Sequence, residues 1–474
     1  MNGVGKSGAV AATVYDEHVL QYAKTEPGSE GDLVIGLDFG TSASKVVIQA
    51  PGLPGNPAYA VDFGEVAHSS MPYLLPTRLW VTPGEGCSLA KQAGSRDVND
   101  IKLDLFSKDQ ELISHRGPTR QGISPETAAV AYLALLLRHA RQWFLEGKRD
   151  VVGHLGRLNW GLNLGVPSPC IEDNEENRRF QRVGKAAWML SVLEDQITLA
   201  KAQYELRLIT EAPEYWERDD DGIACDFAII PEIAAGAIGY ALSDLRREGL
   251  HLMVDVGAWT VDVCSFILHE RQGSDRYSLL TADVQQLGTI RLHQERIRAI
   301  SEAQERQAQD LRDKHDPLSP ITEDVEAYLL SRDRILSAVG EAETELKKRC
   351  QEMLRRVITD LKKRRHPNAS VWRGRLPVIL IGGGGQLPFF RSIVDDLDPW
   401  LKKHIGSEGA AFLPVMVPQT ISSKTAEHHR LAVAWGLSHP DFNIGEITPA
   451  DQIPDIDPPK SVDWKSGFIS KDQV

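Results

Sequence analysis

Two segments of this 474-residue chain place an aspartate at the end of an apolar run, directly before a tight turn of small residues. They read LVIGLDFGTSASK, with Asp38, and HLMVDVGAWTVD, with Asp255. Glycine in such a turn lets backbone amides approach an anion, and successive N–H groups form a concavity for phosphate oxygens. A carboxylate there would repel phosphate unless a cation lay between them, and Mg²⁺ binds one or two carboxylates and bridges phosphates. Two such turns facing each other would clamp a polyphosphate from both sides.

A third candidate element is the run of four glycines at 382–385, which follows the apolar segment VILI and precedes Pro388. Four glycines cost backbone entropy, which is hard to explain unless another group approaches the main chain closely. A flat ligand such as a nucleoside would do so. An ordinary tight turn with a capping aspartate would explain either acidic turn alone, but the ordered set of two acidic turns and a glycine loop favours a nucleotide.

The strands that must position these turns are short and apolar. Strands are expected at 33–38, 45–50, 159–167, on both sides of the glycine turn in 251–268, and at 376–381. The strand–turn–strand units at 33–49 and 252–268 resemble each other, and this duplication organises the chain.

Helices are predicted between these strands. Ser124 followed by Pro125 is typical of a helix start, and 227–242 indicates a strand that leads into a helix of small residues. The charged stretch from 292 to about 365 predicts helix with a break at Asp316-Pro317, and 428–438 predicts a last helix.

The composition of the chain argues against several classes of function. Hydrophobic residues make up 42% and charged residues 25% of the chain, as in ordinary globular proteins. The formal charge of −13 argues against nucleic-acid binding. The five cysteines lie far apart with no Cys-x-x-Cys pair, so neither a zinc knuckle nor a redox dithiol is supported. No apolar run reaches the roughly 18 residues of a membrane span, and the N-terminus is a poor secretion signal, so a soluble, cytoplasmic protein is expected.

The ordered segments LDFGTSASK, VDVGAWTVD and LIGGGGQLP resemble the two phosphate loops and the adenosine loop of the superfamily that contains actin, the sugar kinases and the 70-kDa heat-shock chaperones. SPETAAVAYLALLLRHA, NLGVPSP, EIAAGAIGY and LAVAWGLS resemble further segments of the heat-shock branch, so the resemblance runs from about Leu33 to Ser438. It implies an α/β, actin-like (ribonuclease H-like) fold with two lobes, each built on a mixed five-stranded sheet flanked by helices. It also implies ATP and Mg²⁺ as cofactors and a slow ATPase activity.

The resemblance divides the chain into five parts. They are a flexible tail (1–30), lobe I with a small-subdomain insertion (31–245), lobe II with a helical insertion at about 292–372 (246–425), a final helix returning to lobe I (426–440) and a Pro-rich C-terminal tail (441–474).

Site roles follow from the same resemblance. Asp38 and Asp255 would hold Mg²⁺ through water, Glu232 would orient the attacking water, and Asp262 would lie near it. A lysine is expected at the γ-phosphate, and two candidates remain. Lys45 sits where actin carries its lysine, and Lys102 sits where the heat-shock family carries its own.

Further residues would contact the ligand directly. Those expected at phosphate are Gly40, Thr41, Ser42, Gly257 and Thr260, and those expected at the nucleoside are Gly382, Gly383, Gly384, Gln386, Glu345 and Lys348.

Four positions depart from the family pattern. Ala258-Trp259 replaces two small residues, Gln386 stands in place of an adenine-stacking arginine, and Glu232 lacks the following proline. The turn LGTIRLHQ (287–294) matches the family only in its first half.

The pattern predicts a nucleotide-dependent switch that signals to a protein partner or co-chaperone, because only about 36 residues follow the last helix, too few for a client-binding domain. The stretch near 190–226 and the C-terminal tail are candidate docking elements. A filament-forming actin relative, with self-association, is the alternative, and a small-molecule kinase ranks third because no sugar-binding set can be named. His428-His429 has no partner at metal-ligand spacing and is interpreted as a helix-end pair.

Overall fold

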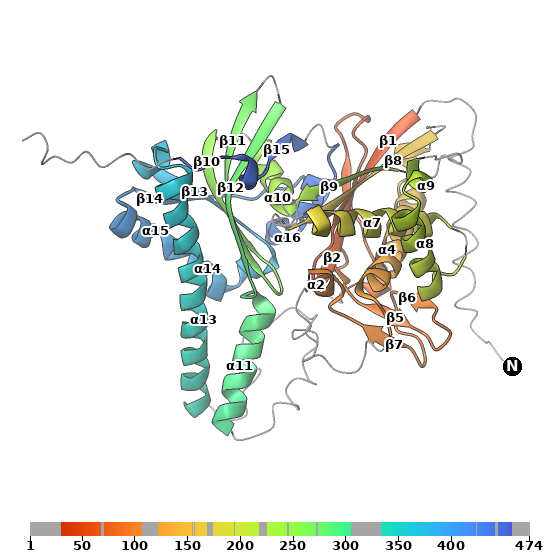
Figure 1. The fold of residues 1–474 in the computed structure, drawn as a ribbon, viewed down its shortest axis with the longest axis horizontal. Coiled ribbons are helices and arrows are strands. Elements are labelled where there is room, and N and C mark those ends of the chain that lie inside the picture. Colours follow the sequence, from red (N-terminus) through yellow and green to blue (C-terminus); the bar gives the residue numbers. More distant parts are fainter. Residues whose placement is uncertain are drawn as a thin grey trace, which may run out of the picture.

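The computed structural model describes residues 30–67, 71–106, 122–153, 155, 157–167, 174–193, 195–217, 225–243, 246–271, 274–304, 333–422, 424–440 and 444–456. These residues form an α/β protein with two mixed sheets, each flanked by helices (Figure 1). The predicted tail at 1–30 lies outside the described residues except for Glu30, which begins the first strand, and so does the predicted helix break at Asp316-Pro317. Among the described helices, none combines the length and apolar character that crossing a bilayer requires.

The first sheet has the order β3-β2-β1-β8-β9, with β4 paired to β2 off this path. Strands β1, β2 and β3 are antiparallel neighbours, whereas β8 and β9 continue the sheet in parallel from β1. Both faces of the central strand β1 are buried from Leu33 to Asp38, which explains its continuous apolar run. The strands are β1 (Glu30–Asp38), β2 (Ala43–Gln49), β3 (Ala58–Ala60), β4 (Leu75–Pro76), β8 (Arg157–Val166) and β9 (Asp226–Pro231).

The second sheet repeats this order. It runs β14-β13-β10-β11-β12-β15, so three antiparallel strands (β10, β11, β12) are again followed on the other side by two parallel ones (β13, β14). The strands are β10 (Gly249–Val256), β11 (Val261–Arg271), β12 (Ser274–Gln285), β13 (Arg375–Ile381), β14 (Gly409–Leu413) and β15 (Glu446–Thr448). The duplication expected from the two acidic hairpins thus extends to five strands on each side.

The expected count of five strands per sheet is wrong, because the described residues form six strands in each of the two large sheets. The sixth strand is β4 in the first sheet and β15 in the second, where it pairs in parallel with β12. Strand β15 lies inside the segment 441–474, for which only a tail was expected.

A small third sheet and several helices complete the first half. The sheet has the order β6-β5-β7, with β5 (Leu79–Val81), β6 (Cys87–Ser88) and β7 (Arg96–Val98). Helices α4, α7 and α8 pack against one another, and Ser124 caps α4 by accepting a hydrogen bond from the backbone N of Thr127 at 3.1 Å, as predicted. The helices are α2 (Ile101–Phe106), α4 (Pro125–Gly147), α5 (Arg149–Val152), α7 (Asn174–Val192), α8 (Leu199–Glu211) and α9 (Glu214–Glu217).

The helices of the second half include a long pair, α11 and α13, that extends from the second sheet (Figure 1). Helix α13 also packs on β11 and α14. The helices are α11 (Thr289–Gln304), α13 (Asp333–Asp360), α14 (Pro388–Asp395) and α15 (Leu397–Trp400).

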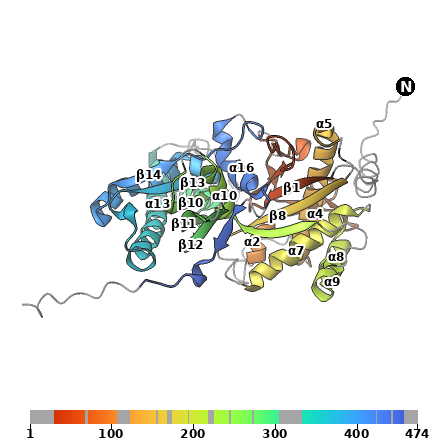
Figure 2. The same cartoon turned by 90° about the horizontal axis from the view of Figure 1, so that it is seen from above.

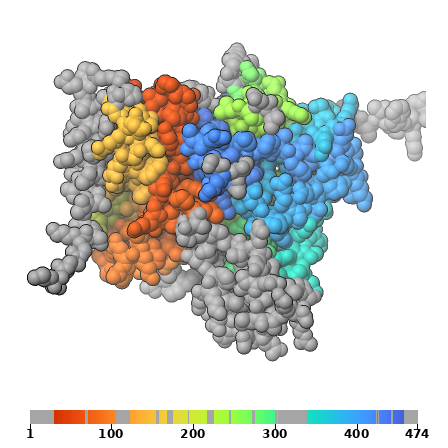
Figure 3. Space-filling view, turned by 180° about the vertical axis from the view of Figure 1, so that it is seen from behind, coloured from red at the N-terminus to blue at the C-terminus, as the bar shows by residue number. Residues whose placement is uncertain are grey.

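Two helices of small residues, α10 (Glu232–Ala241) and α16 (Thr425–Leu437), lie between the two sheets (Figure 2). They contact each other, and α16 also contacts β1, β2 and β13. A Cβ on Gly436 would overlap the carbonyl of Ala235, and a Cβ on Gly36 would overlap that of Ala434. Glycine at these positions therefore lets the helices approach each other and the first sheet. Figure 3 shows the blue C-terminal surface directly against the red-orange surface of the N-terminal sheet.

The four described cysteines, Cys87, Cys225, Cys264 and Cys350, are buried and form no disulfide. Burial raises the pKa of the Cys87 and Cys350 thiols to about 12. The expectation of buried thiols is confirmed for these four residues.

Candidate functional site

One cleft between the two sheets receives all three predicted loops. Its empty space, including the part open to solvent, is about 1180 Å³. Loops separated by more than 100 residues in the sequence meet here because β1, β10 and β13 all end at this edge of their sheets. The predicted residues that line it are Asp38, Gly40, Thr41, Ser42, Lys45, Lys102, Glu232, Asp255, Gly257, Thr260, Asp262, Gly382, Gly383 and Gly384.

The first loop joins β1 to β2 and is fixed by its own hairpin. Asp38 and Lys45 are directly opposite each other in the strand pair, and Lys45 Nζ lies 2.8 Å from Asp38 Oδ2. Thr77 supports the loop from outside by donating its hydroxyl to the Gly40 carbonyl at 2.6 Å. Within the described part of the chain, the amide nitrogens of Thr41 and Ser42 donate no hydrogen bond. Both amides can therefore bind an oxygen of a ligand.

The second loop joins β10 to β11. Here the residue directly opposite Asp255 is Asp262, so two carboxylates occupy the positions that Asp38 and Lys45 hold in the first hairpin. The N-terminus of α11 braces this loop, because Thr289 N donates to Gly257 O at 3.1 Å and Ile290 N donates to Ala258 O at 2.7 Å. The half-buried Trp259 is not among the residues that line the cleft.

The glycine loop follows β13 and forms the third side of the cleft. Gly382 has a φ of 83°, and a Cβ there would overlap Asp255 Oδ1. A Cβ on Gly383 would overlap the Arg430 guanidinium, and one on Gly384 would lie 2.5 Å from Val256 Cγ1. These glycines are therefore required by the close approach of side chains already present. Gln386 is exposed and does not line this cleft.

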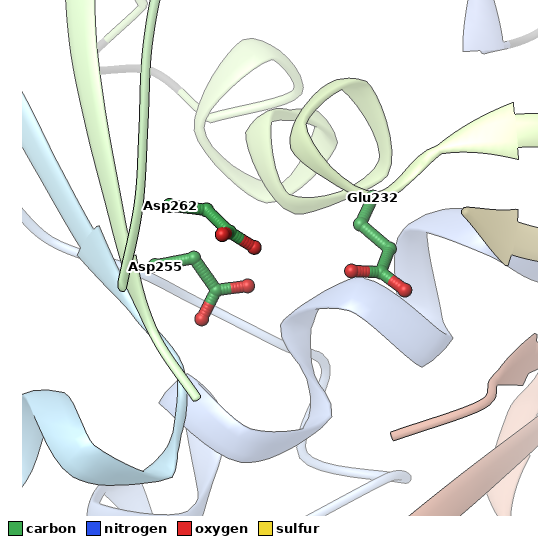
Figure 4. A group of neighbouring side chains, drawn as sticks. All are labelled: Glu232, Asp255 and Asp262. Atoms are coloured by element: carbon green, nitrogen blue, oxygen red, sulfur yellow. The ribbon is translucent and has the colours of Figure 1, made fainter. Parts of the chain in front are cut away.

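Three carboxylates, those of Glu232, Asp255 and Asp262, meet at one point of the cleft (Figure 4). Each offers an oxygen within 4.8 Å of the others. Burial, followed by the charges of Glu232 and Asp38, raises the pKa of Asp255 to about 7. Burial, followed by Asp255 and Glu232, raises the pKa of Asp262 well above its usual range. Asp262 Oδ1 is buried and has no hydrogen-bond partner among the described residues.

This triad fits a divalent cation. Carboxylate oxygens are the ligands that Mg²⁺ prefers, and a cation would both satisfy the orphaned Asp262 oxygen and offset the repulsion within the triad. The sequence pointed to Asp38 and Asp255 as the metal pair. In the structure Asp255 belongs to the triad, whereas Asp38 is paired with Lys45.

Both candidate lysines reach the cleft, so the choice between them remains open. Lys102, on α2, places its Nζ 2.7 Å from Glu232 Oε1, and both side chains are buried. Burial alone would lower the pKa of Lys102, but the charges of Glu232, Asp38 and Asp262 outweigh it and raise that pKa. Gly165, at the end of β8, makes room for this pair, because a Cβ there would lie 3.1 Å from Glu232 Cγ.

Sequence reasoning missed the contribution of α16 to the cleft. His429 and Arg430 both line it. His429 holds the glycine loop, since its carbonyl accepts from Gly382 N at 3.1 Å and its Nδ1 lies 2.9 Å from the Leu380 carbonyl oxygen. Burial lowers the pKa of His429, which favours a neutral ring whose Nδ1–H donates this bond. The only signal in the sequence was the position of both residues directly before LAVAWGLS.

A second hollow of about 850 Å³ adjoins the cleft, with Leu387 lining both. Glu343, Thr344 and Lys347 of α13 face it. Glu345 and Lys348, the residues expected at the nucleoside, are exposed and line neither hollow. The reason is helical geometry, because each residue turns the side-chain direction by about 100°.

A scan of protein-family models gave no match to this chain, and no curated protein matched it. The functional interpretation therefore depends on the geometry of the cleft and on the resemblance of its three loops.

Proposed function

We propose that this protein binds Mg-ATP and hydrolyses it slowly, as a member of the actin, sugar-kinase and 70-kDa heat-shock superfamily closest to the heat-shock ATPase domain. The observation that carries the proposal is the meeting of two aspartate turns and a glycine loop in one cleft between two sheets of the same strand order. A tight turn with a capping aspartate, the ordinary explanation of either acidic turn alone, would not require the three loops to meet. The fold is accordingly proposed to be actin-like.

The chain's own groups suit phosphoryl transfer by positioning and charge. The amides of Thr41 and Ser42 are placed to bind phosphate oxygens, and Lys45 reaches the same loop. Lys45 would exchange its contact with Asp38 for one with phosphate. When bound, Mg²⁺ supplies charge neutralisation and bridges phosphate oxygens. Asp38, Asp255 and Asp262 would hold it, directly or through water.

Glu232 is the group best placed to orient the attacking water. It begins α10, and its carboxylate points toward Asp255 and Asp262 (Figure 4). Lys102 holds Glu232 Oε1 at 2.7 Å, so the orientation of this carboxylate is fixed before any ligand binds. Such preorganisation lowers the cost of reaching the transition state.

The adenosine would extend past Gly382–Gly384 toward the second hollow. Leu387 and Phe389 offer apolar surface there, and Glu343 and Thr344 offer polar groups. This assigns to Glu343, Thr344 and Lys347 the role that the sequence gave to Glu345 and Lys348.

The switch function follows from α10 and α16. Helix α10 begins at Glu232 in the cleft, and α16 carries His429 and Arg430. Both helices pack between the sheets, so a change at the cleft would alter how the two sheets sit against each other. That motion is proposed to be read by a protein partner or co-chaperone.

The test is calorimetric titration and turnover of ATP by the purified protein with Mg²⁺, beside Asp38→Ala and Asp255→Ala. Asp395→Ala, an exposed aspartate on α14 with 53% of its side chain accessible, is the control. Binding lost in the first two variants and kept in the control would support the proposal. A correctly folded wild type that binds no nucleotide would refute it. Sedimentation of the same samples distinguishes the filament alternative, which requires ATP-dependent pelleting.

A further inference from the structure

Arg430 is a cation on the wall of the cleft that the proposed reaction does not use. It lies on α16, and its guanidinium is so close to the glycine loop that a Cβ on Gly383 would overlap it. Tyr73, from the loop that precedes β4, is close enough for its hydroxyl to interact with this charge: burial raises the pKa of Tyr73 to about 12, Glu427 adds to the rise, and Arg430 opposes it. This places Arg430 beside the glycine loop.

The guanidinium has no polar partner in the part of the chain that the structure describes. Glu427, one helical turn earlier, accepts a hydrogen bond from the Ser422 hydroxyl at 2.6 Å and pairs with Lys424 at 3.2 Å. The hydroxyl of Tyr73 is buried and likewise has no partner among the described residues. Two polar groups that come from different parts of the fold and interact electrostatically thus have no hydrogen-bond partner among the described residues.

A partly desolvated cation without a counter-ion is costly. Burial lowers the pKa of Arg430, and Tyr73 and Glu427 only partly oppose this effect. The other cleft cations differ, because Lys45 and Lys102 are each bound to a carboxylate. Among the described residues that line the cleft, Arg430 is therefore the permanent cation that can bind an anion without breaking an ion pair.

We propose that Arg430 binds a phosphate oxygen of the nucleotide beside the glycine loop, and that this contact makes affinity depend on the phosphates more than on the nucleoside. A planar guanidinium suits phosphate because it can donate two parallel hydrogen bonds. This inference rests on the proposed function and adds a ligand contact to the same site.

The test compares ATP, ADP and adenosine, each titrated with Mg²⁺ against wild type, Arg430→Gln and Arg430→Lys. Lys424→Gln is the matched control, since it removes a positive charge from the start of the same helix. Arg430→Gln should weaken ATP and ADP binding by about 10- to 100-fold, as expected for a hydrogen bond to a charged group, and change adenosine binding by less than about twofold. Arg430→Lys should lose less, because it keeps the charge.

Equal losses for adenosine and ATP would overturn the phosphate contact in favour of stacking on the base. Unchanged ATP binding in both variants would also overturn it while leaving the proposed function intact. Failure of the wild type to bind any nucleotide would instead overturn the proposed function together with this contact. Thermal unfolding without ligand should show Arg430→Gln to be at least as stable as wild type, because it removes an unpaired, half-buried cation.

Discussion

Replacing Asp255 by asparagine should make the ligand-free protein more stable at pH 8 while removing its Mg²⁺-dependent nucleotide binding. Asp255 is surrounded by Glu232, Asp38 and Asp262, and it is half-buried at the edge of the second sheet. Asparagine has nearly the same shape but carries no charge, so it relieves the repulsion and the desolvation cost together. A residue kept at such a cost is typical of a functional site.

The size of the effect follows from the pKa of Asp255, which rises from 3.8 to about 7 in the folded protein. Below pH 3.8 the group is protonated in both the folded and the unfolded state, so it has no effect on stability. Between 3.8 and about 7 only the unfolded state loses the proton, and the free energy of unfolding falls as pH rises. Above that range the ionised Asp255 lowers the free energy of unfolding by its full amount, at most about 4 kcal/mol.

The assay is thermal unfolding of wild type and Asp255→Asn between pH 4 and pH 8.5, without and with Mg²⁺. The stability of Asp255→Asn should be nearly equal to that of wild type at pH 4, rise relative to it through neutral pH and level off above it. Adding Mg²⁺ should stabilise the wild type at pH 8 and leave the variant unchanged, because ligand binding stabilises only the state that binds. Asp395→Asn should shift stability by less than about 0.5 kcal/mol at every pH. A variant that is less stable than wild type at pH 8, or an advantage that does not change with pH, would refute the reasoning.

Two further changes probe the cleft and the packing that supports it. Lys102→Met should abolish turnover and destabilise the fold by about 3 to 5 kcal/mol in urea unfolding, because it leaves Glu232 buried without its partner. The double variant Lys102→Met/Glu232→Gln should regain stability but not turnover. A Lys102→Met variant as stable as wild type would contradict the buried ion pair. Gly436→Ala should lower the free energy of unfolding by about 1 to 3 kcal/mol, because its Cβ would overlap the Ala235 carbonyl where α10 meets α16. Gly52→Ala is the control, because a Cβ there meets nothing within 4 Å. Equal stability of the two variants would count against close helix packing.

The sequence predicted the elements whose signal is local. The apolar runs that end in Asp38 and Asp255 became β1 and β10, and the Ser124-Pro125 pair does begin α4. Each of these features is set by residues within one turn or strand, so neighbouring residues suffice to predict it. Strand β15 was not predicted because three residues are too few to show a period, and its pairing with β12 is a long-range event.

The site residues on the three loops were predicted from the sequence, whereas those on α13 and α16 were missed. A glycine turn after a strand has one accessible side, so Gly382–Gly384 could be assigned from sequence alone. On α13 the choice between Glu343 and Glu345 depends on which way the helix is rotated against α14 and α11, which only tertiary packing decides. The same holds for Arg430, whose approach to Gly383 brings together residues 47 positions apart.

The two acidic hairpins are related in structure but not equivalent in charge, and this difference divides their roles. The residue opposite Asp38 is Lys45, so the first hairpin neutralises its own carboxylate. The residue opposite Asp255 is Asp262, and like charges placed directly opposite each other destabilise a strand pair. The second hairpin is therefore proposed to take a divalent cation at Asp255 and Asp262, whereas the first offers a lysine and two amides to an anion. A ligand that joins a divalent cation to a chain of phosphates satisfies both hairpins at once, which neither a metal nor an anion alone would do.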